Sequence, residues 1–285
     1  MASYVALPRT PKLKLPKGAC DSHFHVFGPE RAFPYAKERS YTPPAEAPKE
    51  ALFRLHAFLG IERGVVVQSA VHALDNSASA DLIAARPMCY RGVALMLPTI
   101  SDVDLKKLNQ QGFRGARFHF MKHLASGATM EEILALAKRL AALDWHLQIH
   151  MESTLIGEMA SALARSPVPV VIDHMGRIDA SLGLEQKGFL DLLSLMKTRH
   201  VWVKVSGSER ASRKASPWSD AVPFARKLVA EYGDRVLWGT DWPHPNLKVV
   251  PDDGVLVDLL AEIAPSEAQR RALLVDNPQR FYGFQ

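Results

Sequence analysis

The chain has 285 residues, of which 47% are hydrophobic and 23% are charged, a balance typical of a globular enzyme with a large apolar core. Its formal net charge is +5, but the Lys and Arg residues are spread along the sequence without a basic block, so we expect no nucleic-acid partner. No apolar run approaches the roughly 20 residues that a membrane-spanning helix needs, so we expect no membrane partner either.

We expect residues 1–17 to be an extended lead-in and residues 18–285 to form a single domain. The lead-in lacks the apolar core of an export signal. The chain has two cysteines, Cys20 and Cys89, which lie far apart in the sequence and suit reduced thiols. Together these features predict a cytoplasmic protein.

Apolar, β-branched segments alternate with amphipathic segments along the domain. The first predicted strand carries Asp21 to His25, and the second, at 64–68, has the unbroken Val run of a strand that is buried on both faces. Six further strands are predicted at 92–97, 115–120, 146–150, 168–173, 201–205 and 236–241. Helical patterns lie between the strands, at 52–59, 77–85, 101–110, 130–143, 155–165, 189–197 and 221–232.

This alternation predicts a (β/α)8 TIM barrel, because helical crossovers join parallel strands and eight such units can close on themselves. An open doubly wound sheet is the alternative, but no Gly-rich dinucleotide fingerprint follows the first strand. Helices predicted at 255–263 and 267–274 form a C-terminal helical extension. The loop at 28–48 is long enough to cover a site.

Polar side chains stand at the ends of the predicted strands, where the catalytic groups of a parallel barrel gather. His23 and His25 lie on one face of the first strand, because side chains alternate along a strand. Five of the 11 histidines fall at strand ends, namely His23, His25, His119, His150 and His174. Asp241 ends the eighth strand. A core would hold aliphatic side chains at these positions, so we interpret the set as a functional site.

In these motifs the chain resembles the amidohydrolase superfamily, and within it the branch of 2-pyrone-4,6-dicarboxylate lactonases and related lactonases. The longest matching stretches are 23–29, 172–177 and 238–246. Shorter matches lie at 67–68, His72, 75–76, Gly115 and 117–118. The resemblance extends from about Gly18 to Tyr282, which is almost the whole chain.

The resemblance implies a lactone hydrolase that opens a small anionic lactone during the breakdown of aromatic compounds. Asp241 would be the base that activates water, and His23, His25 and His174 would polarise the carbonyl group, as this histidine set does without a metal in the pyrone lactonases. The positions that match substrate-holding residues of the family are Tyr41, Arg117, Arg210, His244 and Asn246, and Arg177 lies in a matching motif. An arginine suits this role because it can pair both oxygens of a carboxylate.

Three positions depart from the family pattern. His150 stands where the pyrone lactonases have a tyrosine, and His123 where they have a second substrate-binding arginine. Ala70 replaces a serine, with Ser69 one residue earlier. We keep His150, His123 and Ser69 as candidate substrate contacts. These changes leave the particular lactone open.

The departures also leave the cofactor open between none and one divalent ion. A zinc ion would be held by His23, His25, His150, His174 and Asp241, an adequate set of nitrogen and oxygen ligands.

Other functions compete with this interpretation. Within the superfamily these are a zinc-dependent lactonase acting on a muconolactone-type or sugar-acid lactone, and a metal-dependent decarboxylase. A decarboxylase releases carbon dioxide, whereas a lactonase releases a proton and no carbon dioxide. A non-catalytic binder of organic acids or of metal is a third alternative, but it leaves Asp241 without a task. A homo-oligomer is left open.

Overall fold

The computed structural model describes residues 3–121 and 127–285 of the chain. Eight strands form one sheet in sequence order, and every neighbouring pair is parallel. The strands are β1 (Cys20–Phe24), β2 (Arg63–Val67), β3 (Tyr90–Leu95), β4 (Phe113–Phe120), β5 (His146–Met151), β6 (Val170–Ile172), β7 (Val201–Lys204) and β8 (Val236–Leu237).

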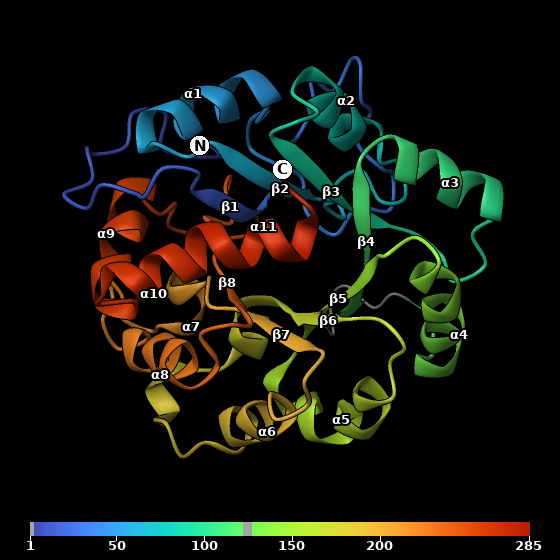
Figure 1. Ribbon diagram of the computed structural model, residues 1–285. Helices are drawn as coiled ribbons and strands as arrows, with labels where there is room; N and C mark the ends of the chain where they lie inside the picture. The colour runs from blue at the N-terminus through green and yellow to red at the C-terminus, as the bar shows by residue number, and fades with distance from the viewer. Residues whose placement is uncertain (1–2, 122–126) are drawn as a thin grey trace.

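Backbone hydrogen bonds join the first strand to the segment that follows the last. Ser22 N donates to Trp238 O at 2.8 Å, and Asp241 N donates to His23 O at 2.8 Å. The sheet thus curls into a barrel, which confirms the predicted (β/α)8 fold and excludes an open sheet (Figure 1). Gly239 permits this approach, because a Cβ atom there would lie 2.4 Å from His23 N.

Helices surround the barrel (Figure 1). They are α1 (Lys49–Leu59), α2 (Ser77–Ala85), α3 (Asp102–Gln110), α4 (Met130–Ala141), α5 (Ile156–Ala164), α6 (Lys187–Leu195), α7 (Ser208–Ala211), α8 (Val222–Tyr232), α9 (Asp253–Ile263), α10 (Glu267–Arg271) and α11 (Asn277–Tyr282). Shorter turns are η1 (Ser153–Leu155), η2 (Asp173–Arg177), η3 (Ala180–Leu182) and the π-helical η4 (Ala272–Asp276). The eighth strand is shorter than predicted, since the chain leaves the sheet after Leu237 and reaches Asp241 in a left-handed conformation (φ 62°).

The barrel interior is apolar at one end and polar at the other. Inward-facing side chains at the amino ends of the strands, such as Val65 and Val93, pack against Tyr282 and Phe284 of the C-terminal segment. Figure 1 shows α11 lying across the ring of strands at this end. The predicted C-terminal helical extension therefore closes the end of the barrel opposite the predicted site.

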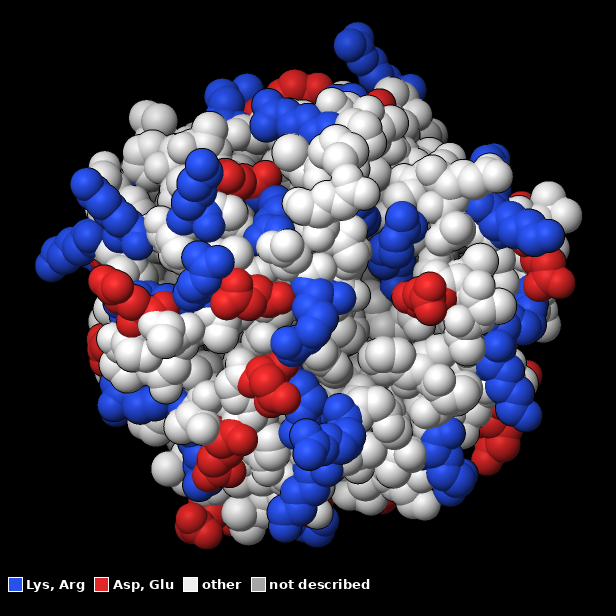
Figure 2. Space-filling view, in the orientation of Figure 1, with Lys and Arg blue, Asp and Glu red and all other residues white. Residues whose placement is uncertain are grey.

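The described part of the lead-in lies against α9. Backbone N–H groups of Lys12 and Leu13 donate to Asp258 Oδ1 at 2.7 and 3.0 Å. The division into residues 1–17 and 18–285 stays a prediction. On the face shown in Figure 2, basic and acidic side chains are interspersed. Among the helices of the described residues, none has the length and apolar character needed to span a membrane.

Candidate active site

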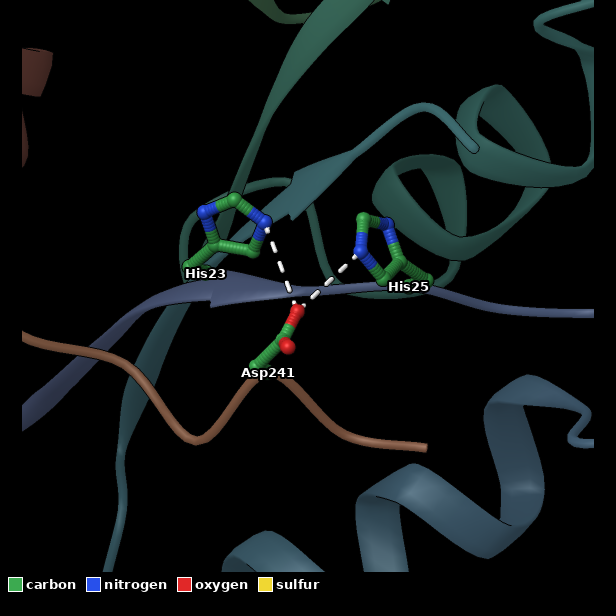
Figure 3. Close-up of side chains that lie close together, drawn as sticks. All are labelled: His23, His25 and Asp241. Carbon is green, nitrogen blue, oxygen red and sulfur yellow. Dashed lines mark ion pairs between the residues drawn. The ribbon is translucent and has the colours of Figure 1, made fainter. Parts of the chain in front are cut away.

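Three histidine rings converge on one oxygen of Asp241. The distances to Asp241 Oδ1 are 3.7 Å from His23 Nε2, 3.3 Å from His25 Nε2 and 3.7 Å from His174 Nε2. Figure 3 shows how His23 and His25 of the first strand face Asp241, which belongs to the segment after β8. All four side chains are buried. The structure thus brings together the four residues that the sequence nominated as catalytic.

A left-handed turn positions His174. The φ angles of His174, Met175, Gly176 and Arg177 are 48°, 53°, 65° and 57°. Each left-handed non-glycine residue costs roughly 1–2 kcal/mol, so packing around the turn must hold it in place. The ring of His174 is fixed by a 3.0 Å contact between Nδ1 and Ser206 Oγ.

A second buried carboxylate, Asp21, joins β1 to the segment that carries Asp241. Its Oδ1 accepts from the backbone N–H groups of His23 and Thr240, each at 3.0 Å, and its Oδ2 accepts from Thr240 Oγ1 at 2.6 Å. Because these bonds link the two strands directly, they fix the spacing between the first-strand histidines and Asp241.

Above the four residues lies a cavity of about 940 Å³. The predicted residues that line it from the strand ends are His25, Ser69, Arg117, His150, His174 and Asp241. Those that line it from loops, turns and helix α7 are Tyr41, Arg177, Asn246 and, on α7, Arg210. Tyr41 belongs to the 28–48 loop, so this loop forms part of the cavity wall.

Two predicted residues of the described part of the chain do not line the cavity. His23 is fully buried beneath it, next to His25 and His174. His244 is directed away, with Nε2 3.1 Å from Asp253 Oδ1. Burial would lower the pKa of His244, but Asp253 outweighs it and raises this pKa. His123 lies outside the described residues.

Two of the cavity arginines already have anionic partners inside the protein. Arg117 places Nε and Nη2 each 2.9 Å from Asp173 Oδ2. Arg210 donates through Nε to Asp241 Oδ2 and through Nη2 to Pro245 O, the latter at 3.0 Å. The protein itself thus supplies an anion to each of these two buried cations, so neither needs one from the substrate to offset its burial.

In contrast to Arg117 and Arg210, Arg177 has no partner of this kind among the described residues. No ion pair or hydrogen bond joins its guanidinium to any residue of the described segments 3–121 and 127–285. Burial, together with the nearby charge of Arg210, lowers the pKa of Arg177 to about 10, so it is still a cation at neutral pH. A partly buried, unpaired guanidinium in a cavity wall is a site for an anion.

The environment keeps Asp241 charged and His23 and His174 neutral. Burial would raise the pKa of Asp241, but Arg210 and His174 outweigh it and hold that pKa well below its usual value. Burial lowers the pKa of His174 to about 3, and burial with Lys204 lowers the pKa of His23 well below its usual value. Near neutral pH the site therefore contains a carboxylate base beside these two uncharged imidazoles.

A buried polar network below the site was not predicted. Lys204 is fully buried on β7, with Nζ 2.8 Å from Gln148 Oε1 and 3.1 Å from His23 Nδ1. Gln148 also donates to Asp173 Oδ2 at 3.2 Å. The signal was present in the sequence, because a lysine interrupts the apolar strand at 201–205 and a glutamine lies between the two histidines of strand five.

Glu209 was also missed. It lines the cavity next to Arg210, and neither of its carboxylate oxygens has a hydrogen-bond partner in the described part of the chain. Burial raises the pKa of Glu209, against the opposing effect of Arg210.

His23, His25 and Asp241 offer ligand atoms that all lie within 4.8 Å of one another, but their donor chemistry does not fit a metal completely. Ligand atoms about 2.1 Å from a tetrahedral ion lie about 3.4 Å apart, close to the 3.3 Å between His25 Nε2 and Asp241 Oδ1. His25 fits, since Nδ1 contacts the Val67 carbonyl at 2.7 Å and leaves Nε2 for a metal. His23 does not fit, because its Nδ1 faces the Lys204 ammonium, which can only donate.

His150 is not part of the converging set. Its Nδ1 lies 3.1 Å from His119 Nδ1, and the groups of potential metal ligands in the described residues do not include it. The five-residue zinc set is therefore not assembled.

A (β/α)8 barrel with a carboxylate and histidines at the carboxyl ends of its strands defines a hydrolase-type site. The model of the amidohydrolase family (Amidohydro_2) matches residues 20–284, and the chain belongs to this family, as its motifs predicted.

Named relatives extend the comparison. The chain is 44% identical to the 2-pyrone-4,6-dicarboxylate hydrolase of Comamonas testosteroni, over 98% of this chain and 94% of the relative. It is 41% identical to the 4-sulfomuconolactone hydrolase of Hydrogenophaga intermedia, over 94% of this chain and 90% of the relative. A crystal structure from Pseudomonas putida, provisionally named a 2-pyrone-4,6-dicarboxylic acid hydrolase, is 32% identical with a TM-score of 0.82, covering 95% of this chain and 99% of that one. The predicted resemblance to lactonases of this superfamily is confirmed.

Proposed function

We propose that this protein is a lactonase that hydrolyses a small lactone carrying at least one carboxylate. The observation that carries the proposal is the convergence of the Nε2 atoms of three histidines within 3.7 Å of Asp241 Oδ1, below a cavity whose wall holds the unpaired Arg177. The names of the relatives support it, since both describe hydrolases of anionic cyclic esters.

The attacking water is placed between Asp241 and His25. A carbonyl oxygen only accepts, so His25 carries its hydrogen on Nδ1 toward Val67 and presents a lone pair at Nε2, 3.3 Å from Asp241 Oδ1. A water that donates one hydrogen to each of these atoms keeps an oxygen lone pair for the lactone carbonyl carbon.

Proton transfer to Asp241 accompanies the attack. The carbonyl oxygen faces Nε2 of His174, with His23 behind it, and these rings stabilise the negative charge of the tetrahedral intermediate. When the ring C–O bond breaks, the protonated Asp241 returns its proton to the departing ring oxygen. The overall change adds one water to the lactone and consumes no other reactant.

Arg177 is proposed to hold the substrate carboxylate, with Tyr41 and Asn246 closing the wall on the loop side. Arg117 and Arg210 contribute positive potential while remaining paired with Asp173 and Asp241. Such a site favours an anionic lactone over a neutral one of the same size.

A panel of lactones tests the function. In weakly buffered solution, we expect one proton released per ring opened and no carbon dioxide for 2-pyrone-4,6-dicarboxylate or a muconolactone, with much slower turnover of unsubstituted 2-pyrone. Arg177→Met should lower kcat/KM on the carboxylated lactone by roughly ten- to a few hundredfold, the scale of one lost charge-assisted pair, and should change the neutral reaction little.

Arg213→Met is the matched control, because that exposed arginine lies on the same cavity and is already paired with Asp179 at 2.8 Å. It should leave both rates nearly unchanged. Carbon dioxide release would indicate a decarboxylase instead. Equal losses on charged and neutral lactones in Arg177→Met would remove the support for an anionic substrate.

We also infer that the protein acts in the cytoplasm, in keeping with its two cysteines, which are both free. A homo-oligomer is left open, and sedimentation of the purified protein would establish its assembly state.

A further inference from the structure

We infer that Lys204 fixes the tautomer of His23 with the ring hydrogen on Nε2, so that His23 is a hydrogen-bond donor toward the reaction site instead of a metal ligand. Lys204 contacts His23 Nδ1 at 3.1 Å and does not line the cavity. It is therefore a positioning residue that acts through His23.

Lys204 Nζ is surrounded by groups that accept hydrogen bonds. It lies 2.8 Å from Gln148 Oε1 and 3.6 Å from the carboxylate oxygen Asp173 Oδ1, as suits an ammonium. An ammonium has three hydrogens to donate and no lone pair, so its 3.1 Å contact with His23 Nδ1 requires the ring nitrogen to accept. A ring that accepts at Nδ1 carries its single hydrogen on the other nitrogen, Nε2.

Asp173 is the competing partner of the same ring atom. Its Oδ1 lies 3.3 Å from His23 Nδ1, and a ring hydrogen there would point toward it. This is the longer of the two contacts to Nδ1, the contact from Lys204 being 3.1 Å, and within the described residues Asp173 Oδ1 has no hydrogen-bond partner. The same oxygen lies 3.6 Å from Lys204 Nζ, so Asp173 stabilises the ammonium charge.

The two rings of the His-x-His motif then carry opposite tautomers. His25 donates through Nδ1 to the Val67 carbonyl and offers a lone pair at Nε2. His23 accepts at Nδ1 and offers a hydrogen at Nε2, an atom that is buried and has no hydrogen-bond partner in the described part of the chain. If the proposed hydrolysis is correct, one ring orients the water and the other faces the carbonyl oxygen.

A metal ion bound to His23 would need a lone pair on Nε2, but in the inferred tautomer this atom carries a hydrogen. A metal-bound imidazole normally donates its second N–H to an acceptor, and loss of such a partner changes metal affinity by roughly 10- to 100-fold. Lys204 presents a donor in that place and so disfavours zinc. Removing the ammonium lets Nδ1 donate to Asp173 and frees Nε2 to bind a metal.

Nitrogen NMR of the histidine rings tests the inference on the wild-type protein. Long-range proton–nitrogen spectra of 15N-histidine-labelled protein at pH 7 distinguish protonated from lone-pair ring nitrogens, and the signals of His23 are those lost in His23→Gln. We expect a hydrogen on Nε2 and a lone pair on Nδ1. A hydrogen on Nδ1 would overturn the inference.

Zinc titration of the metal-stripped protein gives a second readout. Lys204→Met should bind zinc at least about tenfold more tightly than wild type, and its His23 hydrogen should move to Nδ1. Arg91→Met removes another buried cation of the barrel interior, which contacts Pro87 and Gly283, and should leave zinc affinity unchanged.

An unchanged zinc affinity in Lys204→Met would contradict the inference. Neither readout uses a substrate, so failure of the lactonase proposal and failure of the tautomer assignment are separately visible.

Discussion

One neighbouring side chain lowers the pKa of Asp241 more than any other. A fully buried carboxylate is expected to be protonated at higher pH than a solvated one. Here the Arg210 guanidinium contacts Asp241 Oδ2 directly, and this contact is the largest of the effects that lower the pKa of Asp241. Asp241 is therefore ionised and can accept a proton throughout the neutral range. We expect the acid limb of the pH dependence of kcat/KM to lie well below the usual pKa of an aspartate.

Replacing Arg210 with Met should move the acid limb of kcat/KM to higher pH. Asp241 acts as a base only when ionised, so activity is present above its folded pKa and is lost as the pH falls through that value. Without Arg210 the pKa rises, and kcat/KM at pH 5 should fall at least about threefold relative to pH 7, while wild type stays flat. Arg210→Lys keeps the charge and should keep the limb low. Identical pH profiles for the two variants would show that charge at this position does not control the base.

At the scale of elements, the turn after β6 carries the strongest local strain near the site. Four consecutive residues, 174–177, have left-handed backbone angles, and the turn supplies both His174 and Arg177 to the cavity. Gly176 lies in its centre, where an added Cβ atom would lie 2.5 Å from Ile156 Cδ1. A side chain at this position would therefore have to adopt a positive φ of 65° and displace the Ile156 Cδ1 methyl group.

Gly176→Ala should lower the free energy of unfolding by about 1–3 kcal/mol and reduce kcat, because the displaced turn moves His174. Gly183→Ala is the matched control, since Gly183 also has a positive φ of 77° but an added Cβ atom would meet nothing within 4 Å. It should cost only about 1 kcal/mol and leave kcat unchanged. Urea unfolding and steady-state rates measure both effects. Equal kcat in the two variants would mean that the turn does not position the histidine.

Regular elements could be predicted because their signals are local. The helix at 77–85 has the predicted bounds, and His25 and Asp241 follow the carboxyl ends of β1 and β8, although β8 already ends at Leu237. The left-handed turn at 174–177 could not be predicted, because three of its residues are not glycine and no local pattern favours φ > 0 for them. Helix α7 was also missed, since four residues are too few to show a helical period.

At the scale of the molecule, the side chains that stabilise the barrel and those that form the candidate active site lie at opposite ends. One end is filled by apolar side chains and covered by α11, whereas the other carries the cavity and its charged groups. Phe284 packs into the covered end, with its ring centroid 5.3 and 5.0 Å from the guanidinium carbons of Arg63 and Arg91. Catalytic groups at one face of a (β/α)8 barrel and stabilising groups at the other are the usual division of this fold.

Phe284→Ala should therefore destabilise the protein by about 3–5 kcal/mol while leaving kcat/KM near the wild-type value at temperatures where the variant is folded. Leu182→Ala, at a side chain that is 67% exposed, is the control and should shift stability by less than about 0.5 kcal/mol. Thermal unfolding with parallel rate measurements tests this. A large loss of kcat/KM in folded Phe284→Ala would show that the two ends of the barrel are coupled.

Long-range pairing is the part of the site that the sequence did not reveal. Arg117 and Asp173 are 56 residues apart, and Lys204 and His23 are 181 residues apart, so neither pair leaves a periodic signal. Which arginine is paired and which is free depends on how the barrel closes. The strand-end residues could be named from the sequence, but the choice of Arg177 as the anion site required the structure.

The most direct test is the turnover of a carboxylated lactone by Asp241→Asn, followed by proton release in a pH-stat. The account predicts a kcat at least about a hundredfold below wild type, because Asn cannot accept the proton of the attacking water, with circular dichroism unchanged. An Asp241→Asn protein that opens the lactone at the wild-type rate would contradict the account, since the water would then be activated by another group.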